Sequence, residues 1–328
     1  MDLINEYNCA AVIIGRNEGK RLMSCIKSLL NHVNHIVYVD SGSTDNSLKD
    51  AKALGVDSLS LDMSTPFTAA RARNEGAQYL MLQHTGLKYI QFVDGDCEID
   101  PDWMGKAQDF LEKNAQYAVV CGRRRERFPE QSIYNQLCDI EWNTPVGDAN
   151  ACGGDALIRV DAFKQVDGYR ADLIAGEEPE MCFRLRQNGW KIRRLDAEMT
   201  LHDAAINKFS QWWRRTVRGG YAFALGKSIH GRSKEQFWVK ENQRIVVWGI
   251  FIPVLIVILV MYNLVFFGLL AIYLIQIVRV GIKRPDLGGI RFIWATSVVL
   301  GKFPEAVGLI QCMKNRIAKT RSKIIEYK

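Results

Sequence analysis

Two carboxylates one residue apart are the first feature of this sequence that could do chemistry. Asp94 and Asp96 flank Gly95 and directly follow the apolar residues Phe92 and Val93. Carboxylate oxygens are preferred ligands of hard divalent cations, and the glycine permits a close approach. The pair could therefore share an ion with the oxygens of a diphosphate. Such an ion would neutralise charge on a departing nucleotide. Taken alone, Asp-Gly-Asp fits a simple turn equally well.

The elements that must position this pair are strands of a parallel sheet. Short apolar runs rich in β-branched residues alternate with stretches at helical spacing, and this alternation predicts βαβ units in an α/β fold. The runs are Cys9–Gly15, His35–Asp40, Lys88–Asp94 and Ala118–Gly122, and the helical stretches include Arg21–Leu30 and Ala69–Leu82. Ligands bind such sheets at the carboxyl ends of strands. Because two runs end in aspartate, at Asp40 and Asp94, we expect a ligand there.

The Asp94–Asp96 pair is one of five short motifs that follow one another along the chain, and together they are more specific than the pair alone. They are Arg16-Asn17-Glu18, Asp40-Ser41-Gly42-Ser43-Thr44-Asp45, Ala72-Arg73-Asn74-Glu75-Gly76, Asp94-Gly95-Asp96 and Gly176-Glu177-Glu178. In this combination, over about residues 9–205, the sequence resembles the family 2 glycosyltransferases. The resemblance implies the GT-A fold, a Rossmann-like α/β domain with a mostly parallel sheet that binds a nucleotide sugar.

The resemblance also implies roles for individual residues. Glu18 and Asp40 would contact the base and ribose of a nucleoside diphosphate sugar, and Arg73 would lie near the nucleotide or its phosphates. Asp94 would touch the ribose or the metal, and Asp96 would be the principal ligand of Mg²⁺ or Mn²⁺. The segment Ser43–Asp45 could equally cap the following helix.

An acidic pair at the start of a helix would supply the general base. The family usually has Glu-Asp at this place, whereas this chain has Glu177 and Glu178. A sugar hydroxyl is a poor nucleophile at neutral pH, so a carboxylate within hydrogen-bond reach accelerates its attack. We expect Glu178 to act as the base, with Glu177 as the second candidate. Alternatively, both residues only complement the positive end of the helix.

Further along the chain, three features are weaker candidates. His202 could be a third metal ligand, because a neutral imidazole binds such ions, or it could be structural. Asp155 follows two glycines and could lie near the acceptor. The segment Gln211–Arg215 resembles the Gln-x-x-Arg-Trp motif of processive family members, but its last residue is arginine, which argues against processivity. Arg214 and Arg215 could clamp the diphosphate or contact lipid headgroups, with the neighbouring tryptophans in a membrane interface.

The last third of the chain carries a membrane signal. The 34 residues from Ile245 to Val278 contain no charge. A single helix of that length would measure about 51 Å, against a hydrocarbon core of about 30 Å. Two helices turning near Tyr262 and Asn263 fit better, and basic residues at both flanks predict that both ends face the cytosol. A re-entrant hairpin and a buried hairpin of a soluble protein are the alternatives.

These observations predict four segments. Residues 1–205 form the catalytic domain, 206–244 a basic, tryptophan-rich membrane-proximal segment, 245–280 the hairpin, and 281–328 a basic amphipathic tail on the membrane surface. The polar N-terminus lacks the layout of a signal peptide, and the eight cysteines form no CxxC pair. We therefore expect an enzyme of the inner or plasma membrane whose catalytic domain is cytosolic.

The function expected from the sequence is an inverting glycosyltransferase of polysaccharide or glycolipid biosynthesis. It would move a sugar from a nucleoside diphosphate to a hydroxyl of a lipid-linked or membrane-associated glycan. One alternative is transfer to polyprenyl phosphate, which is already anionic and needs no base. Another is a non-catalytic membrane scaffold with the same fold. Nucleic-acid binding is not expected, because the basic tail lacks aromatic interleaving and a recognisable module. The sequence leaves the donor, the acceptor and the oligomeric state open.

Overall fold

A nine-stranded mixed sheet organises the first part of the chain. The computed structural model describes residues 9–320 and divides the chain into two units, one up to Asn207 and one from Lys208. This division lies close to the domain boundary predicted at residue 205. The strand order is β3-β2-β1-β4-β8-β6-β9-β5, with β7 paired to β9. The strands are β1 (Cys9–Gly15), β2 (His35–Asp40), β3 (Asp57–Ser60), β4 (Tyr89–Asp94), β5 (Cys97–Ile99), β6 (Tyr117–Glu126), β7 (Gly147–Ala149), β8 (Ala156–Arg159) and β9 (Lys191–His202).

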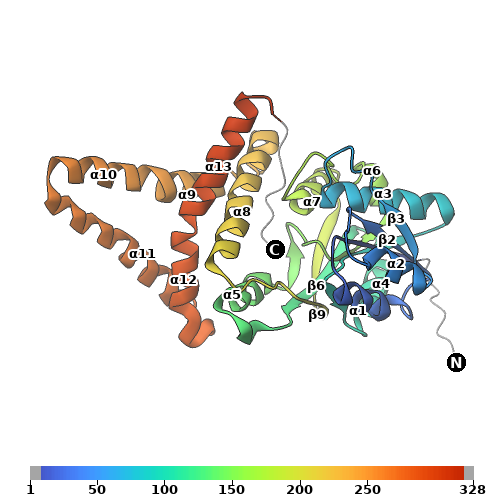
Figure 1. Cartoon of the computed structure of the whole chain (residues 1–328). Coiled ribbons are helices and arrows are strands. Elements are labelled where there is room, and N and C mark those ends of the chain that lie inside the picture. Colours follow the sequence, from blue (N-terminus) through green and yellow to red (C-terminus); the bar gives the residue numbers. More distant parts are fainter. Residues whose placement is uncertain (1–8, 321–328) are drawn as a thin grey trace. The chain divides into compact units, whose positions relative to one another are not determined.

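Seven α-helices accompany this sheet in the first unit (Figure 1). They are α1 (Lys20–Leu29), α2 (Ser47–Ala53), α3 (Ala69–Gln83), α4 (Trp103–Lys113), α5 (Ile133–Trp142), α6 (Val160–Gln165) and α7 (Glu177–Gln187). The hydroxyl of Thr68 caps α3 by accepting a bond from the Arg71 amide at 3.0 Å. Gly76 then lets α3 lie close to the sheet, since a Cβ there would be 2.6 Å from a Val12 methyl. The four predicted strands and both predicted helices are present. Their bounds differ by at most one residue from those expected, except that β6 continues to Glu126, four residues past the predicted end at Gly122.

The registers of the strands bring the acidic residues to one edge. Strand β1 pairs in parallel with β2 and β4, which places Gly15 beside Asp40 and Ile14 beside Asp94. Strand β9 pairs with β5 and β6, so His202 lies opposite both Cys97 and Glu126. The carboxyl ends of β1, β2 and β4 therefore form one part of the site, and the ends of β6 and β9 form the other.

The second unit is helical. Its elements are α8 (Phe209–His230), α9 (Val239–Val246), a π-helical turn η2 (Val247–Phe251), α10 (Ile252–Tyr262), η3 (Leu264–Leu270), α11 (Ala271–Ile282), η4 (Pro285–Ile290), α12 (Arg291–Leu300) and α13 (Lys302–Ile317). Helices α8 and α13 cross closely at two glycines. A Cβ on Gly220 would collide with the Glu305 carbonyl, and one on Gly308 with the Val217 carbonyl. Glycine is therefore needed on both sides of this crossing.

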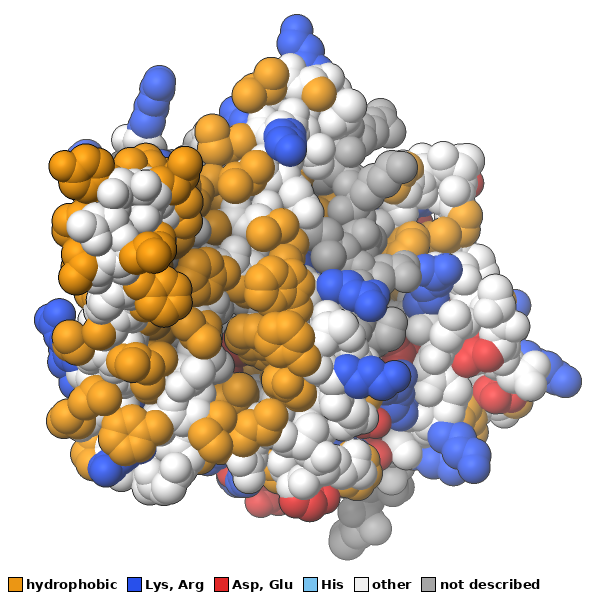
Figure 2. Space-filling view, turned by 60° about the vertical axis from the view of Figure 1, so that its left-hand side comes forward, with side chains coloured by type: hydrophobic (Ala, Val, Ile, Leu, Met, Phe, Trp, Pro, Cys, Tyr) orange, Lys and Arg blue, Asp and Glu red, His pale blue; other side chains and the backbone are white. Residues whose placement is uncertain are grey.

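Three helices of this unit are long and apolar enough to cross a membrane: Val239–Tyr262, Leu264–Ile282 and Pro285–Ile317. The first two are joined at Asn263, close to the predicted turn, and its side chain accepts a bond from the Val265 amide at 2.9 Å. Hydrophobic side chains gather over these helices on the face shown in Figure 2.

The third of these helices falls in the segment expected to lie on the membrane surface, 281–328. Its length and composition also allow it to cross. The basic residues Arg321 and Lys323 of that tail, and the polar N-terminus, lie outside the described residues.

Candidate active site

His202 and Asp96 meet at the edge of the sheet. Strand β9 ends beside β5, and His202 Nε2 lies 3.3 Å from an Asp96 carboxylate oxygen. Both residues are more than nine-tenths buried. The structure therefore brings together two of the three residues predicted to bind a metal ion.

The chemistry of this pair fits a divalent cation. Two neighbouring ligands of an octahedral ion with bonds near 2.1 Å lie about 3 Å apart, close to the observed separation. The Cys97 thiol belongs to the same group, in which the three potential ligand atoms lie within 4.8 Å of one another. However, burial raises the pKa of Cys97 well above its ordinary value. Because a thiol binds metals as thiolate, Asp96 and His202 are the better ligands here.

Arg73 connects this edge to the acidic helix α7. The guanidinium is buried, with Nη2 2.8 Å from Asp94 Oδ1 and Nη1 3.0 Å from both Glu177 Oε1 and Glu178 Oε1. The central carbon of the guanidinium, Cζ, also lies 5.5 Å from the centre of the Tyr169 ring. One arginine thus holds the end of β4 and the start of α7 in a fixed relation.

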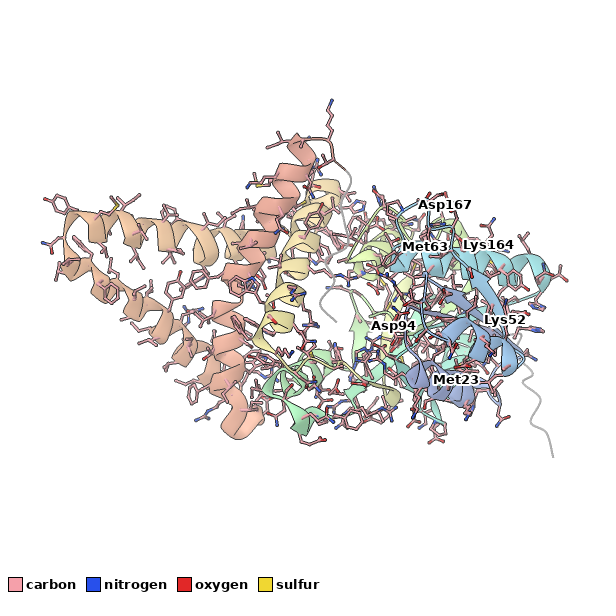
Figure 3. All side chains as sticks on the ribbon, viewed as in Figure 1. Met23, Lys52, Met63, Asp94, Lys164 and Asp167 are labelled. Atoms are coloured by element: carbon pink, nitrogen blue, oxygen red, sulfur yellow. The ribbon has the colours of Figure 1, made fainter. Side chains whose placement is uncertain are left out.

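Asp94 is bound by arginines on both sides. Asp94, one of the residues labelled in Figure 3, pairs with Arg73 and, at 3.2 Å, with Arg124 of β6. Burial alone would raise the pKa of Asp94, but Arg73 and Arg124 hold it below its ordinary value. Asp94 is not in the Asp96–Cys97–His202 group. It belongs to a second group of potential ligands, with Cys97 and Asp155.

Asp155 does not face an acceptor, contrary to the sequence-based suggestion. It is completely buried, accepts a bond from the Asp94 amide at 3.1 Å and one from the Thr200 hydroxyl at 2.7 Å, and pairs with Arg124 at 2.7 Å. These bonds tie the ends of β4, β6 and β9 together. Asp155 is therefore a structural residue beneath the site.

Glu178 has the electrostatics of a general base. Burial and the neighbouring Glu177 raise its pKa to about 7, against the opposing effect of Arg73. The Glu177 side chain is 4% exposed and that of Glu178 16%, so Glu178 is the more accessible of the two. Helix α7 begins after Gly176, whose φ of 80° suits glycine. The difference in exposure supports Glu178 over Glu177.

Asp40 is the last residue of β2, and Glu18 lies in the loop after β1. The Asp40 carboxylate accepts bonds from the Tyr38 hydroxyl at 2.8 Å and from the Ser43 amide at 2.9 Å. Glu18 pairs with Arg21 at 2.8 Å. A Cβ on Gly95 would lie 3.2 Å from Glu18 Cγ, so this glycine lets Glu18 approach the Asp94–Asp96 segment.

Of the Ser43–Asp45 segment, which was expected either to contact the ligand or to cap the next helix, only Asp45 bonds to the start of α2, and the N-cap residue itself is Asn46. The Asn17 side chain accepts a bond from the Thr44 amide at 2.7 Å, and Ser43 accepts one from the Asn17 amide at 2.9 Å. Asp45 accepts a bond from the Ser47 amide at the start of α2.

Arg214 and Arg215 lie on α8 of the second unit. They are not among the residues that the first unit brings together.

Comparison with known proteins decides the family. Residues 10–166 match the family model described as "Glycosyl transferase family 2". The chain carries a family 2 glycosyltransferase domain. The transferase is also similar to "Succinoglycan biosynthesis protein ExoA" of Rhizobium meliloti (strain 1021). They are 23% identical over 229 residues, which cover 65% of this chain and 68% of the relative.

A solved glycosyltransferase structure shares the fold of the transferase. A mannosyltransferase, PcManGT from Pyrobaculum calidifontis in complex with GDP-Man and Mn²⁺, matches 92% of this chain and 87% of its own, with a TM-score of 0.58 and 13% identity. GalNAc-T7 with UDP, GalNAc and Mn²⁺ matches 73% of this chain and 55% of its own, with a TM-score of 0.46 and 15% identity.

Two residues of the transferase site escaped the sequence reasoning. Arg124 and Glu126 follow the apolar run at Ala118–Gly122 and point to the same face of β6, because they are two residues apart. Arg124 meets Asp94, and Glu126 lies near His202. The charged residues Arg123-Arg124-Arg125-Glu126 directly follow an apolar run in the sequence. Because ligands bind at the ends of such strands, this pattern could have indicated site residues.

Proposed function

We propose that this glycosyltransferase is metal-dependent and inverting, and that it moves a sugar from a nucleoside diphosphate to a glycan hydroxyl. The observation that carries the proposal is the position of Arg73, which touches both Asp94 and the base candidate Glu178. A donor diphosphate beside the Asp94–Asp96 segment and an acceptor beside Glu178 would then be separated by little more than one guanidinium.

In the proposed reaction Glu178 accepts the proton of the acceptor hydroxyl. The oxygen attacks the anomeric carbon on the face opposite the nucleoside diphosphate, and the bond to the diphosphate breaks in the same displacement. One displacement inverts the anomeric configuration. Asp96 and His202 would hold Mg²⁺ or Mn²⁺, and the ion would supply charge neutralisation of the leaving diphosphate. Asp40 and Glu18 would bind the base and ribose.

We place the reaction at a membrane. Three helices have the length and composition to cross one, and the similar ExoA protein is a succinoglycan biosynthesis protein. Lys240, Arg244, Arg279 and Lys283 at the ends of the uncharged segment support a cytosolic base for the hairpin. The proposed acceptor is a lipid-linked or membrane-associated glycan of polysaccharide or glycolipid biosynthesis. The alternative role for Arg214 and Arg215 as lipid headgroup contacts belongs to the same proposal.

The test compares Glu178→Gln and Glu177→Gln in the purified full chain, with Mn²⁺ or Mg²⁺ and a panel of nucleotide sugars. Loss of a general base lowers the turnover rate about 10²- to 10⁴-fold. We expect this loss for Glu178→Gln, with donor binding retained, and a smaller one for Glu177→Gln. If Glu178→Gln turns over normally, an acceptor that needs no base, such as polyprenyl phosphate, replaces the hydroxyl acceptor. If the wild type binds no nucleoside diphosphate with either ion, the scaffold alternative applies.

A further inference from the structure

Glu126 is a carboxylate buried without a basic partner. Its side chain has no exposed surface, and its two oxygens accept bonds from the backbone amides of Phe128, at 3.1 Å, and Ala204, at 3.0 Å. Among residues 9–320, no lysine or arginine lies within ion-pair distance of it. Removing a carboxylate from water costs several kcal/mol unless nearby groups compensate. The hydrogen bonds from the two amides compensate only part of this cost. We therefore expect a further partner for the Glu126 carboxylate.

That partner faces Glu126 across the sheet. The β6–β9 register pairs Glu126 with His202, and His202 Nδ1 lies 3.9 Å from Glu126 Oε2. The distance is too long for a hydrogen bond, and Nδ1 is buried with no hydrogen-bond partner among the described residues. The opposite ring nitrogen, Nε2, points to Asp96. The histidine is thus placed between two carboxylates, one for each nitrogen.

Aromatic packing restricts how the imidazole can turn. The Trp142 ring meets the His202 ring edge to face, with centres 4.7 Å apart, and Arg124 lies 5.6 Å from the Trp142 centre. A half-turn of the ring would put Cδ2 and Cε1 where Nδ1 and Nε2 now lie, and both carboxylates would then face carbon atoms. Only the observed orientation gives each carboxylate a nitrogen.

We propose that Glu126 is a positioning residue that keeps His202 protonated on Nδ1 and leaves the Nε2 lone pair free for the ion held with Asp96. A neutral imidazole carries one N–H, so a metal-binding Nε2 requires the proton on Nδ1. A buried N–H needs an acceptor, and metal-binding histidines almost always donate their other N–H to a carboxylate, a carbonyl or water. The inference rests on the metal site of the proposed function. It adds the residue that sets the state of one ligand.

The alternative is that Glu126 only braces the backbone at Phe128 and Ala204. That role would make Glu126→Gln less stable without changing the affinity of the folded protein for metal. The two roles are therefore separable by measuring affinity and stability on the same sample.

The first experiment measures the dissociation constant of Mn²⁺ by electron paramagnetic resonance on the full chain in nanodiscs, with UDP or GDP present. Loss of a carboxylate partner of a metal-binding histidine typically weakens metal affinity 10- to 100-fold. We expect about this loss in Glu126→Gln and a larger one in His202→Gln. The matched control is Glu112→Gln, a partly exposed carboxylate on α4 paired with Lys88, which should bind Mn²⁺ as the wild type does.

The second experiment reads the tautomer in the wild type loaded with diamagnetic Mg²⁺ and UDP or GDP, because without an ion the Asp96 carboxylate, 3.3 Å from Nε2, would favour a proton on that nitrogen. The chain has only five histidines, so the ¹⁵N imidazole signals of His202 can be assigned by comparison with His202→Gln. We expect Nδ1–H in the wild type, and a mixture of tautomers in Glu126→Gln. This measurement on the wild type also serves if the Glu126 variant fails to fold.

The outcomes distinguish the inference from the proposed function. If the wild type binds Mn²⁺ through His202 but Glu126→Gln binds it equally well, Glu126 is a backbone brace and only the inference is overturned. If His202 carries its proton on Nε2 in the Mg²⁺-loaded wild type, Nε2 is not a ligand and the proposed metal site is overturned too. If His202→Gln binds Mn²⁺ as tightly as the wild type, the proposed metal site is itself wrong and the inference falls with it.

Discussion

Lowering the pH through 7 should switch off sugar transfer by protonating Glu178. Its pKa is raised to about 7, so about half of the enzyme carries an ionised base at pH 7 and about one tenth at pH 6. A glutamate at its ordinary value of 4.5 would still be almost fully ionised at pH 6. The turnover rate should therefore fall about tenfold from pH 8 to pH 6, and level off above pH 8.

The sign of this dependence follows from the role of the group. A general base is active only when deprotonated, so a raised pKa moves the loss of activity upward in pH. Burial and the charge of Glu177 raise the pKa of Glu178, and Arg73 limits the rise by favouring the ionised form. With a phosphate acceptor, protonation of Glu178 would not lower the turnover rate in this way, because the attack of a phosphate needs no base.

The assay measures initial rates at saturating donor, acceptor and Mn²⁺ from pH 5.5 to 8.5. Saturating Mn²⁺ keeps the metal site filled at each pH, so that a change in rate reports on the base. In Glu178→Gln the residual rate should lose its dependence on pH near 7. A wild-type profile that is flat between pH 6 and 8, or a Gln variant that keeps the wild-type profile, would refute the assignment of the base.

Three further predictions test the surroundings of the site and the second unit. Gly154→Ala should lower activity at least tenfold, because the new Cβ would lie 2.5 Å from the Arg73 guanidinium, whereas Gly153→Ala, with open space around it, should not; equal rates in both variants would contradict this. Gly308→Ala should lower the melting temperature in detergent by separating α8 from α13, at a cost of about 1–3 kcal/mol. Gly219→Ala on α8, with nothing near its Cβ, is the control, and a matching shift there would remove the explanation. Chelation of divalent ions should abolish transfer, and either Mg²⁺ or Mn²⁺ should restore it; full activity in chelator would exclude the metal-dependent reaction.

The parts of the fold that the sequence predicted are those fixed by local patterns. Continuous apolar runs such as Cys9–Gly15 belong to buried parallel strands, and their periodicity differs from that of helices. Because parallel strands end at the same edge, the runs ending in Asp40 and Asp94 predicted a ligand at that edge, and the register places both residues there, on the two strands that flank β1.

Contacts that depend on register between distant strands could not be predicted in the same way. Glu126 meets His202 only because β6 and β9 pair with irregular shifts in register, which no local pattern announces. The burial of Asp155 has the same origin, since its partners Thr200 and Arg124 come from other strands. The third candidate membrane span, Pro285–Ile317, was not predicted for a different reason. Its basic residues are typical of a helix that lies on the membrane surface.

The balance of charge around Asp94 explains why the separate parts of the proposed mechanism belong together. Four carboxylates, those of Asp94, Asp155, Glu177 and Glu178, share two guanidiniums. An anionic diphosphate approaching this excess of negative charge would be repelled unless a cation accompanied it. The same excess disfavours ionisation of Glu178, the more exposed of the two glutamates, and so contributes to its raised pKa. Metal dependence of donor binding and a base that titrates near neutral pH are thus two consequences of one electrostatic arrangement.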